Sequence, residues 1–523
     1  MTSRRAYDRW LQTPSPLQYA LLLYALALVP RLIFVLAAGR ADLSLDEIEY
    51  HLLARNLAAG NGYRWYFGLL SSFRPPGYPF FLAGVYYLFG PSYFVARIIQ
   101  TVIAASAPVF TYLIGQRVFG ERAGRLGGLF VALYIPLILY SVGLLTENIF
   151  IPLLLLAILF LLKADERRSR LNSACAGLCL AASILIRPEI TYALPLIFLW
   201  MLWPPRTWKG PAINIAIIFV IVAAVVTPWS VRNTRLTGQF VYLDTRTGYN
   251  LYIGYRDGAD GTFNMDAAQD LVNEFIKDNL ARLSQSSKVR LTDADVRRLL
   301  YQELLSYKNP VSDSDELRRR YNLDAAESDV VMHNWGKERA LAFMREHPWK
   351  SIGLIAPKFA HFWGLEHRLF LFAYSYNFIG HLPPLVLTLC LLLLLSPFVL
   401  LTLFSVVGAL FADRYDKKLV LLLLPILFYT ALHSLTFGEA RFHFVIIPCL
   451  ALLAANGMIL LPTIRARWRS SNPSAKRTLR RRAIAALVLV GLFAAIWTYG
   501  LWISRDNLRA VFSPNGNQSH LTF

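Results

Sequence analysis

The chain has 523 residues, of which 56% are hydrophobic and only 16% are charged, with a mean hydropathy of +0.43. Soluble proteins carry about 25% charged residues, so this composition excludes a soluble globular protein and indicates that lipid surrounds most of the chain. The formal net charge is +20. The distribution of the basic residues assigns this charge to membrane topology rather than to nucleic-acid binding.

Eleven apolar stretches are candidate membrane spans, because about 20 residues are needed to cross ~30 Å of hydrocarbon. Lys and Arg cluster in alternate connections and in the run at 465–482, and this positive-inside pattern places the N-terminus in the cytoplasm. We interpret the basic run as a topology anchor that touches anionic lipid. The predicted spans are 17–38, 93–116, 126–142, 147–162, 172–187, 189–203, 211–229, 383–411, 418–435, 443–462 and 483–503.

These spans divide the chain into four parts. The N-terminal membrane module covers 1–229 and includes the first outer loop, 39–92. An outer insertion follows at 230–382, then C-terminal membrane helices at 383–503. The polar tail 504–523 is predicted to be outside and poorly ordered.

The first outer loop is predicted to hold two short helices outside the membrane. The first begins after Ser44, because Glu47 follows three positions later as in a capping box, and it ends at Gly60. The second covers 78–90, and its 13 residues are too few to cross a bilayer. The prolines of FRPPGYPFF (73–81) fix an extended turn before it.

The first of these helices carries the strongest candidate for chemistry. Asp46, Glu49 and Tyr50 share one face, because positions i, i+3 and i+4 are neighbours on a helix. Asp46 lies in the first turn, where the helix dipole favours an ionised carboxylate, and such a group beside the membrane suits a general base. The alternative is a charge that only steadies the helix. For Glu47, the capping role is the simpler interpretation.

A group of polar residues is predicted to gather on the same side of the membrane. Arg74 in FRPPGYPFF can bind a phosphate bidentately; the alternative is an arginine that snorkels to lipid headgroups. Charged groups near hydrocarbon tend to face a cavity or a partner, so the convergence predicts a site for a phosphorylated head group whose tail stays in lipid. The alternative is mutual ion pairing without function. The other members are Glu147, Asn148, Arg187, Glu189, Glu439 and Arg441.

The insertion contains three stretches with the mixed apolar and charged spacing of amphipathic helices, near 266–283, 293–306 and 334–347. The aromatic and apolar segment 349–364 is predicted to lie along the membrane interface and to be broken at Pro357.

Cofactor motifs give little signal. His361, His367 and Glu366 could contribute to a metal site, but no tight ligand spacing such as HExxH occurs, so no metal or other cofactor is expected. The sequence has neither a P-loop nor a GxGxxG motif. An activated substrate is therefore expected to come from the membrane itself.

The order of these motifs resembles the GT-C superfamily of membrane glycosyltransferases, in particular the branch of the protein O-mannosyltransferases and lipid A aminoarabinose transferases. The residues of these motifs differ from those of the aminoarabinose branch, so the resemblance implies neither that sugar nor lipid A as a substrate. The matching pieces are LDEIEY (45–50), FRPPGYPFF (73–81), AGRLGGLFVAL (123–133), LLTEN (144–148), LIRPE (185–189), TPWSVRNTRLTGQFV (227–241), EHPWKSIGLIAPKFAHFWG (346–364) and GEARFHFVIIPCLALLAA (438–455).

The resemblance implies an all-α polytopic GT-C fold in the bacterial inner membrane, with its active site at the periplasmic face. It implies inverting transfer of a sugar from a polyprenyl-phosphate donor to lipopolysaccharide or lipid A, another glycan, a lipid or a protein. Asp46 is then the catalytic base with Glu47 as its assistant, and Arg74 holds the donor phosphate, with Arg187 and Arg441 as further candidates. The candidate substrate contacts are Glu49, Tyr50, Tyr78, Glu147, Asn148, Glu189 and Glu439.

Two further expectations follow from the chemistry. In-line displacement needs the base on the opposite side of the sugar from the phosphate, so we expect Asp46 and Arg74 to lie roughly 6–10 Å apart across a cavity. The rival function is a transporter or flippase of a lipid-linked sugar that breaks no bond. Transporters often show inverted repeats, and none is visible in this sequence.

Overall fold

The computed structural model describes residues 14–38, 40, 43, 45–64, 70–203, 208–263, 325–375, 377, 380–412, 415–469 and 473–518. Over these residues the regular elements are helices, with one isolated antiparallel bridge between Arg64 and Leu70. The predicted all-α class is confirmed. Ser44 and the predicted helices 266–283 and 293–306 lie outside the described residues.

Eight helices of the described chain are long and apolar enough to cross a membrane, and the pair Glu121–Ala132 and Ile135–Val142, bent by 51°, makes a ninth if it is one span. The predicted count of eleven is not confirmed, because α10 (Arg170–Ile186) and Pro188–Leu202 are shorter apolar helices. The 17 residues of α10 reach about 25 Å at 1.5 Å per residue, less than the ~30 Å of hydrocarbon. The eight are α2 (Pro16–Ala38), Tyr93–Val118 (α5 and α6), α9 (Glu147–Arg167), α12 (Lys209–Thr237), α21 (Pro384–Leu410), α22 (Lys417–Leu435), Ala440–Arg469 (η4 and α23) and Lys476–Ile503 of α24 (Pro473–Ile503).

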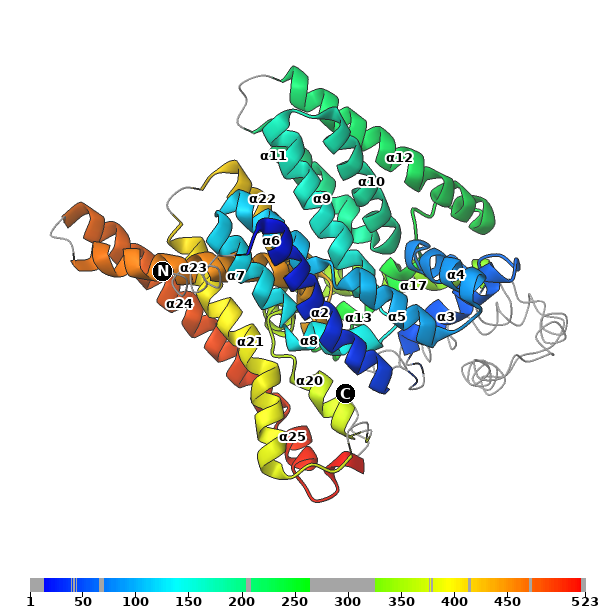
Figure 1. The fold of residues 1–523 in the computed structure, drawn as a ribbon. Helices are drawn as coiled ribbons and strands as arrows, with labels where there is room; N and C mark the ends of the chain where they lie inside the picture. Colours follow the sequence, from blue (N-terminus) through cyan, green and yellow to red (C-terminus); the bar gives the residue numbers. More distant parts are fainter. Residues whose placement is uncertain are drawn as a thin grey trace, which may run out of the picture.

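The helix α23 (Ile447–Arg469) forms the centre of the membrane part and packs against α6, α7, α21, α22 and α24. It crosses α21 at a pair of glycines, where a Cβ added to Gly408 would lie only 1.8 Å from the carbonyl oxygen of Leu453. Small residues let two membrane helices approach this closely. Figure 1 shows α21 and α24 side by side on one flank and the packed group α9, α10 and α12 on the other.

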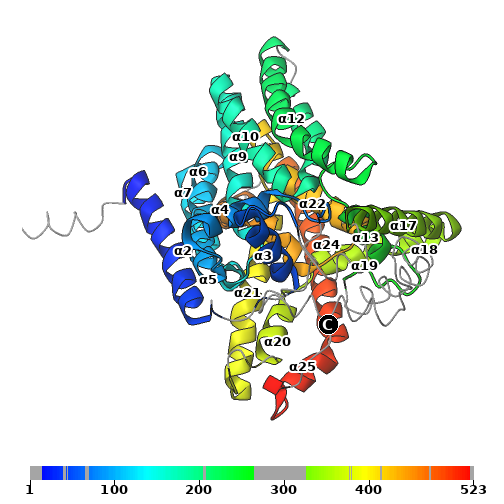
Figure 2. The same ribbon diagram turned by 90° about the vertical axis from the view of Figure 1, so that its right-hand side faces the viewer.

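Two short helices of the first outer loop, α3 (Leu45–Ala58) and α4 (Gly77–Phe89), pack against each other near the middle of the view in Figure 2. Beyond the end of α3, Gly60 adopts a left-handed conformation with a φ of 77°, which favours glycine. The predicted helix at 78–90 corresponds to α4, whose 13 residues are too few for a span.

The insertion supplies helices that lie against the first outer loop. α13 (Arg246–Gly254) packs on α17 (Ala325–Glu346), and α17 contains the predicted helix 334–347. Their backbones touch, since a Cβ on Gly248 would lie 1.9 Å from the carbonyl oxygen of His333. The two helices therefore form one closely packed unit.

The aromatic segment after α17 breaks earlier than predicted. α18 (Pro348–Gly353) ends before Leu354, and α19 (Ile355–Phe362) runs through Pro357. The predicted break at Pro357 is wrong, because this proline lies in the first turn of α19, where a backbone N–H has no intrahelical partner to lose.

Residues 505–511 and 516–518 of the tail form short helices, against the prediction of a poorly ordered tail. α25 (Arg505–Val511) packs on α20 (His367–Ser375), and Val511 is fully buried there. Polarity was the basis of the prediction, but a few apolar residues suffice to dock a short terminal helix.

Candidate active site

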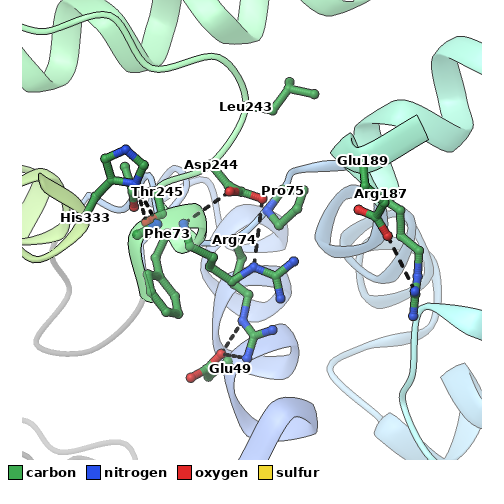
Figure 3. A network of polar contacts seen from close by, with 12 residues as sticks. Glu49, Phe73, Arg74, Pro75, Arg187, Glu189, Leu243, Asp244, Thr245 and His333 are labelled. Atoms are coloured by element: carbon green, nitrogen blue, oxygen red, sulfur yellow. Dashed lines mark hydrogen bonds and ion pairs between the residues drawn. The ribbon is translucent and has the colours of Figure 1, made fainter. Parts of the chain in front are cut away.

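The predicted face of α3 forms the centre of the candidate site. The carboxylate of Asp46 lies between two guanidinium groups, with Arg74 Nη2 2.7 Å from Oδ1 and both Nη atoms of Arg441 3.2 Å from Oδ2. Arg74 also donates from Nε to Glu49 and from Nη1 to the hydroxyl of Tyr50 at 3.4 Å. Figure 3 shows the Arg74 side chain pointing at Glu49. Of the predicted acids and arginines, Asp46, Glu49, Arg74 and Arg441 are thus in direct contact.

The direct contact between Asp46 and Arg74 corrects one expectation. The two groups were expected roughly 6–10 Å apart across a cavity, but they form an ion pair at 2.7 Å. Arg74 is buried, and pairing with Asp46 offsets part of the cost of taking its charge out of water.

The two carboxylates on this face differ in their affinity for a proton. Burial opposes ionisation of Asp46, but the nearby guanidinium groups of Arg74 and Arg441 outweigh it and hold the pKa of this carboxyl well below its usual range. Burial raises the pKa of Glu49, and the charge of Asp46 adds to this rise. Environments that push the pKa values of two neighbouring acids apart are typical of acid–base sites. Asp46 therefore holds a proton less tightly than Glu49 does.

Arg74 is held by a turn that the sequence dictates locally. The hydroxyl of Tyr63 donates to the carbonyl oxygen of Arg74 at 2.9 Å and to that of Pro75 at 3.1 Å. After the two prolines, Gly77 packs directly on α10, where a Cβ would lie 2.7 Å from the backbone of Leu185. Only glycine permits this approach. The guanidinium is therefore carried by a rigid turn rather than by a free loop.

A second group of charges forms around Arg187, at the end of α10. Its Nη2 lies 2.7 Å from Glu147 Oε1, its Nη1 lies 3.5 Å from Glu189 Oε1, and its Nε donates to the hydroxyl of Thr146 at 3.3 Å. Figure 3 shows Arg187 and Glu189 facing each other beside the Arg74 group. Asn148 donates from Nδ2 to the carbonyl oxygens of Tyr140 and Gly143 at 3.1 and 3.2 Å.

Arg441, on η4 (Ala440–Ile446), brings a third polar pair to the site. Its Nε lies 3.2 Å from Glu439 Oε2, while its Nη atoms reach Asp46. Its side chain is 31% exposed, compared with 7% for Arg74. Arg441 is therefore the more accessible of the two guanidinium groups on Asp46.

Two predicted site residues make structural contacts instead. The carboxylate of Glu47 accepts from Arg97 Nη2 at 2.9 Å and from the backbone N–H of Leu144 at 2.6 Å. Tyr78 is 1% exposed and donates its hydroxyl to Gln100 at 2.7 Å. Both tie α3 and α4 to the membrane helices, so the geometry favours neither an assisting role for Glu47 nor a substrate contact for Tyr78.

The sequence prediction missed a contribution from the insertion. Arg246, at the start of α13, exerts its positive charge on both Asp46 and Glu49. Its backbone N–H donates to Asp244 Oδ1 at 3.1 Å, and its Nε lies 3.8 Å from Oδ2. Burial raises the pKa of Asp244. The only sequence signal was the close spacing of two opposite charges in LDTRTG (243–248), which did not reveal their distance from Asp46.

The predicted metal-binding candidates are engaged in other contacts. Glu366 Oε1 lies 2.6 Å from both His443 Nε2 and the hydroxyl of Tyr134, and His367 Nε2 lies 2.7 Å from the hydroxyl of Ser504. Among the described residues, no group of three His, Cys, Asp or Glu side chains could hold a metal ion.

Comparison with solved structures gives distant similarities. The chain is 15% identical to ArnT from Cupriavidus metallidurans bound to undecaprenyl phosphate, over 87% of this chain and 81% of that one, with a TM-score of 0.39. It is 14% identical to the oligosaccharyltransferase of Archaeoglobus fulgidus in the apo form, with a TM-score of 0.49. That match covers 98% of this chain but only 57% of the archaeal chain. Among curated proteins, none matches this sequence.

A family model gives the clearest assignment. Residues 73–231 match the dolichyl-phosphate-mannose-protein mannosyltransferase family. This segment includes Arg74, Glu147 and Arg187 and ends before the insertion helices. The match covers less than a third of the chain and agrees there with the resemblance seen in the sequence, and the apolar helices make the chain a multi-pass membrane protein.

Proposed function

We propose that this protein transfers a sugar, with inversion, from a polyprenyl-phosphate donor to an envelope acceptor at the periplasmic face of a bacterial inner membrane. The observation that carries the proposal is the position of Asp46 between the guanidinium groups of Arg74 and Arg441. A base and two anion-binding groups from distant parts of the sequence are what displacement of a phosphate by a hydroxyl requires.

The donor phosphate is assigned to Arg74, with Arg441 beside it. As the bond between the anomeric carbon and the phosphate oxygen breaks, the electron pair stays on the phosphate, and guanidinium groups stabilise this charge. Arg187 is a weaker candidate because its ion-pair partners are Glu147 and Glu189 rather than Asp46. Cationic side chains supply this stabilisation without a metal, so we propose a metal-independent reaction, which activity in the presence of EDTA would test.

A small apolar pocket lies near the Arg187 group. It lies between α9, α10, α11 and α22 and is lined by side chains such as Leu154, Ile190 and Phe428. At its wall, the buried hydroxyl of Tyr429 has no hydrogen-bond partner among the described residues, and Tyr429 is within electrostatic range of Glu189 and Arg187.

The ion pairs of Asp46 give the donor a second role. Held by Arg74 and Arg441, Asp46 has a low pKa and is a weak base. A donor phosphate that draws the guanidinium of Arg74 away from Asp46 opens a gap for the sugar, so that the base and the phosphate lie on opposite sides of it, as in-line displacement requires. Loss of this contact also raises the pKa of Asp46 and makes it a stronger base. Asp46 then takes the proton of the acceptor hydroxyl as its oxygen attacks the anomeric carbon. Base strength thus increases only when the donor is bound.

The acceptor is proposed to enter from the insertion side. Arg246 acts electrostatically on Asp46, and Tyr249 of the same helix places its ring 6.2 Å from Phe73, beside Arg74. These residues belong to the insertion, whereas the apolar pocket lies among the membrane helices. The acceptor classes are lipopolysaccharide or lipid A, another glycan, a lipid or a protein.

The test is transfer by the purified full-length protein in lipid nanodiscs, given a radiolabelled polyprenyl-phosphate sugar and an envelope extract. We expect free polyprenyl phosphate and a product of inverted anomeric configuration, both lost in Asp46→Asn. Asp257→Asn is the matched control, since the side chain of Asp257 is 82% exposed. A flippase moves the donor across the bilayer without releasing free polyprenyl phosphate, and that outcome would reject the proposal.

A further inference from the structure

The two residues before Phe73 and Arg74 are fixed by three separate elements. Asp329 Oδ2, from α17, accepts from the backbone N–H of Ser72 at 2.9 Å and from the hydroxyl of Ser71 at 3.0 Å. Arg232 Nη1, from α12, donates to the carbonyl oxygen of Ser71 at 2.5 Å. The backbone N–H of Thr245, just before α13, donates to the carbonyl oxygen of Ser72 at 3.1 Å.

Asp329 is the part of this arrangement that the proposed reaction does not use. It is 3% exposed and far in sequence from its serine partners. Its helix is itself held, because the imidazole Nδ1 of His333 lies 3.0 Å from the carbonyl oxygen of Thr245 and 3.2 Å from the backbone nitrogen of Gly248 and bonds to one of them, according to its tautomer. Figure 3 shows His333 and Thr245 in contact beside Phe73 and Arg74. The insertion thus fixes Ser71 and Ser72 through residues that are themselves held in place.

A buried carboxylate without a cation in contact needs a reason to be there. Asp329 forms no ion pair within the described part of the chain; the charged groups that act on it are Glu49 of α3 and Arg232 of α12. Burial raises its pKa to about 7, because the hydrogen bonds from Ser71 and Ser72 offset only part of the lost hydration. An apolar side chain would be cheaper to bury. We interpret the carboxylate as present because it accepts the hydrogen bonds that hold Ser71 and Ser72.

We propose that Asp329 is a positioning residue that sets the location of Arg74 for the donor phosphate through Ser71 and Ser72. The inference rests on the proposed role of Arg74 in donor binding. Arg74 follows Ser72 by two residues, so a shift of Ser72 is passed to the guanidinium through two peptide units. Sites that bind and transfer a group need their side chains held within about 0.5 Å of the productive geometry.

The experiment measures binding of undecaprenyl phosphate to the full-length protein in nanodiscs at pH 8. Asp329→Ala removes the acceptor of both serine bonds and is expected to weaken binding about tenfold. Asp329→Asn keeps an oxygen for the same donors and should restore binding to within about threefold of the wild type. Glu338→Ala, an exposed acid on the same helix, is the matched control and should bind like the wild type.

The variants separate this inference from the proposed function. If Arg74→Gln binds undecaprenyl phosphate like the wild type, the donor site itself is wrong. If Arg74→Gln is impaired but Asp329→Ala binds normally, only the positioning role is rejected. Should Asp329→Ala fail to fold, Ser71→Ala removes one of the same bonds and is expected to weaken binding about threefold. Equal loss of binding in Asp329→Asn and Asp329→Ala would also overturn the proposal, because rescue by the amide is its specific signature.

Discussion

Asp46 and Glu47 are neighbours in sequence but belong to different parts of the molecule. The side chain of Asp46 is 30% exposed, and its partners come from a turn and from η4. The side chain of Glu47 is 7% exposed and lies between Arg97 and the backbone of Leu144. One face of α3 thus holds a charge that a ligand can reach, whereas the other holds a charge that fastens the helix. Accessibility to an exchanging partner separates the two roles.

Neutralising Asp46 is expected to have the largest effect on sugar transfer. Asp46→Asn keeps the volume and can still accept from Arg74 and Arg441, but it cannot take a proton. We expect sugar transfer to fall about 10³-fold, while the midpoint of thermal unfolding stays near that of the wild type. Transfer rates and unfolding curves in nanodiscs check both. Transfer within a few-fold of the Asp257→Asn control would remove Asp46 from catalysis.

The two guanidinium groups on Asp46 should differ in weight. Arg74→Gln removes the buried, rigid group and is expected to lower the rate of transfer about 100-fold. Arg441→Gln removes the more exposed group and should cost less, because water partly screens its charge. The comparison uses single-turnover rates at saturating donor. Arg345→Gln, at an exposed position of α17, is the control, and a larger loss in Arg441→Gln would reverse the assignment.

Helical periodicity predicted the common face of Asp46, Glu49 and Tyr50, because positions i, i+3 and i+4 are a local property of the chain. The partner of Glu47 could not be predicted in the same way, since Arg97 lies fifty positions away. The capping motif suggested a local role, and the structure adds a long-range ion pair. Spacing within one element is local information, whereas contacts between elements depend on how the whole chain packs.

The count of spans and the approach of Arg246 show the same limit. Hydropathy located the apolar stretches, but whether α10 is a full span depends on its length and on the Arg187-Pro188 interruption that follows it. Arg246 follows a membrane helix by only a short segment, yet its charge reaches Asp46. No periodicity marks such a position.

Removing Glu47 tests the structural face of α3. Glu47→Ala leaves the buried guanidinium of Arg97 without this carboxylate and the N–H of Leu144 without its acceptor. Breaking a buried ion pair in this way destabilises a protein by about 3 kcal/mol, so thermal unfolding should occur at lower temperature. Transfer per folded molecule should stay within about threefold of the wild type. Unfolding at the temperature of the Glu338→Ala control would contradict the structural role.

A third acid, Asp329, is buried like Glu47 but should make the stability of the protein depend on pH. Asp329 is as buried as Glu47, but neutral donors rather than a cation hold it. Its pKa is raised to about 7 in the folded protein, above the ordinary value of about 3.9, so the folded state binds the proton more tightly. The stability from this group is present below about pH 4 and is lost as the pH rises to about 7.

Asp329→Asn carries no such titration, so its unfolding temperature relative to the wild type should rise between pH 5 and pH 8. Hydrogen bonds from the serines persist in both proteins, so the titration of Asp329 alone sets this change. Neutralising a buried acid thus stabilises the fold where no cation faces it, whereas removing Glu47 destabilises the fold where Arg97 does. A gap between Asp329→Asn and the wild type that stays constant over this pH range would mean that Asp329 does not titrate there. The proposed difference between Glu47, which has a cationic partner, and Asp329, which has none in contact, would then not hold for Asp329.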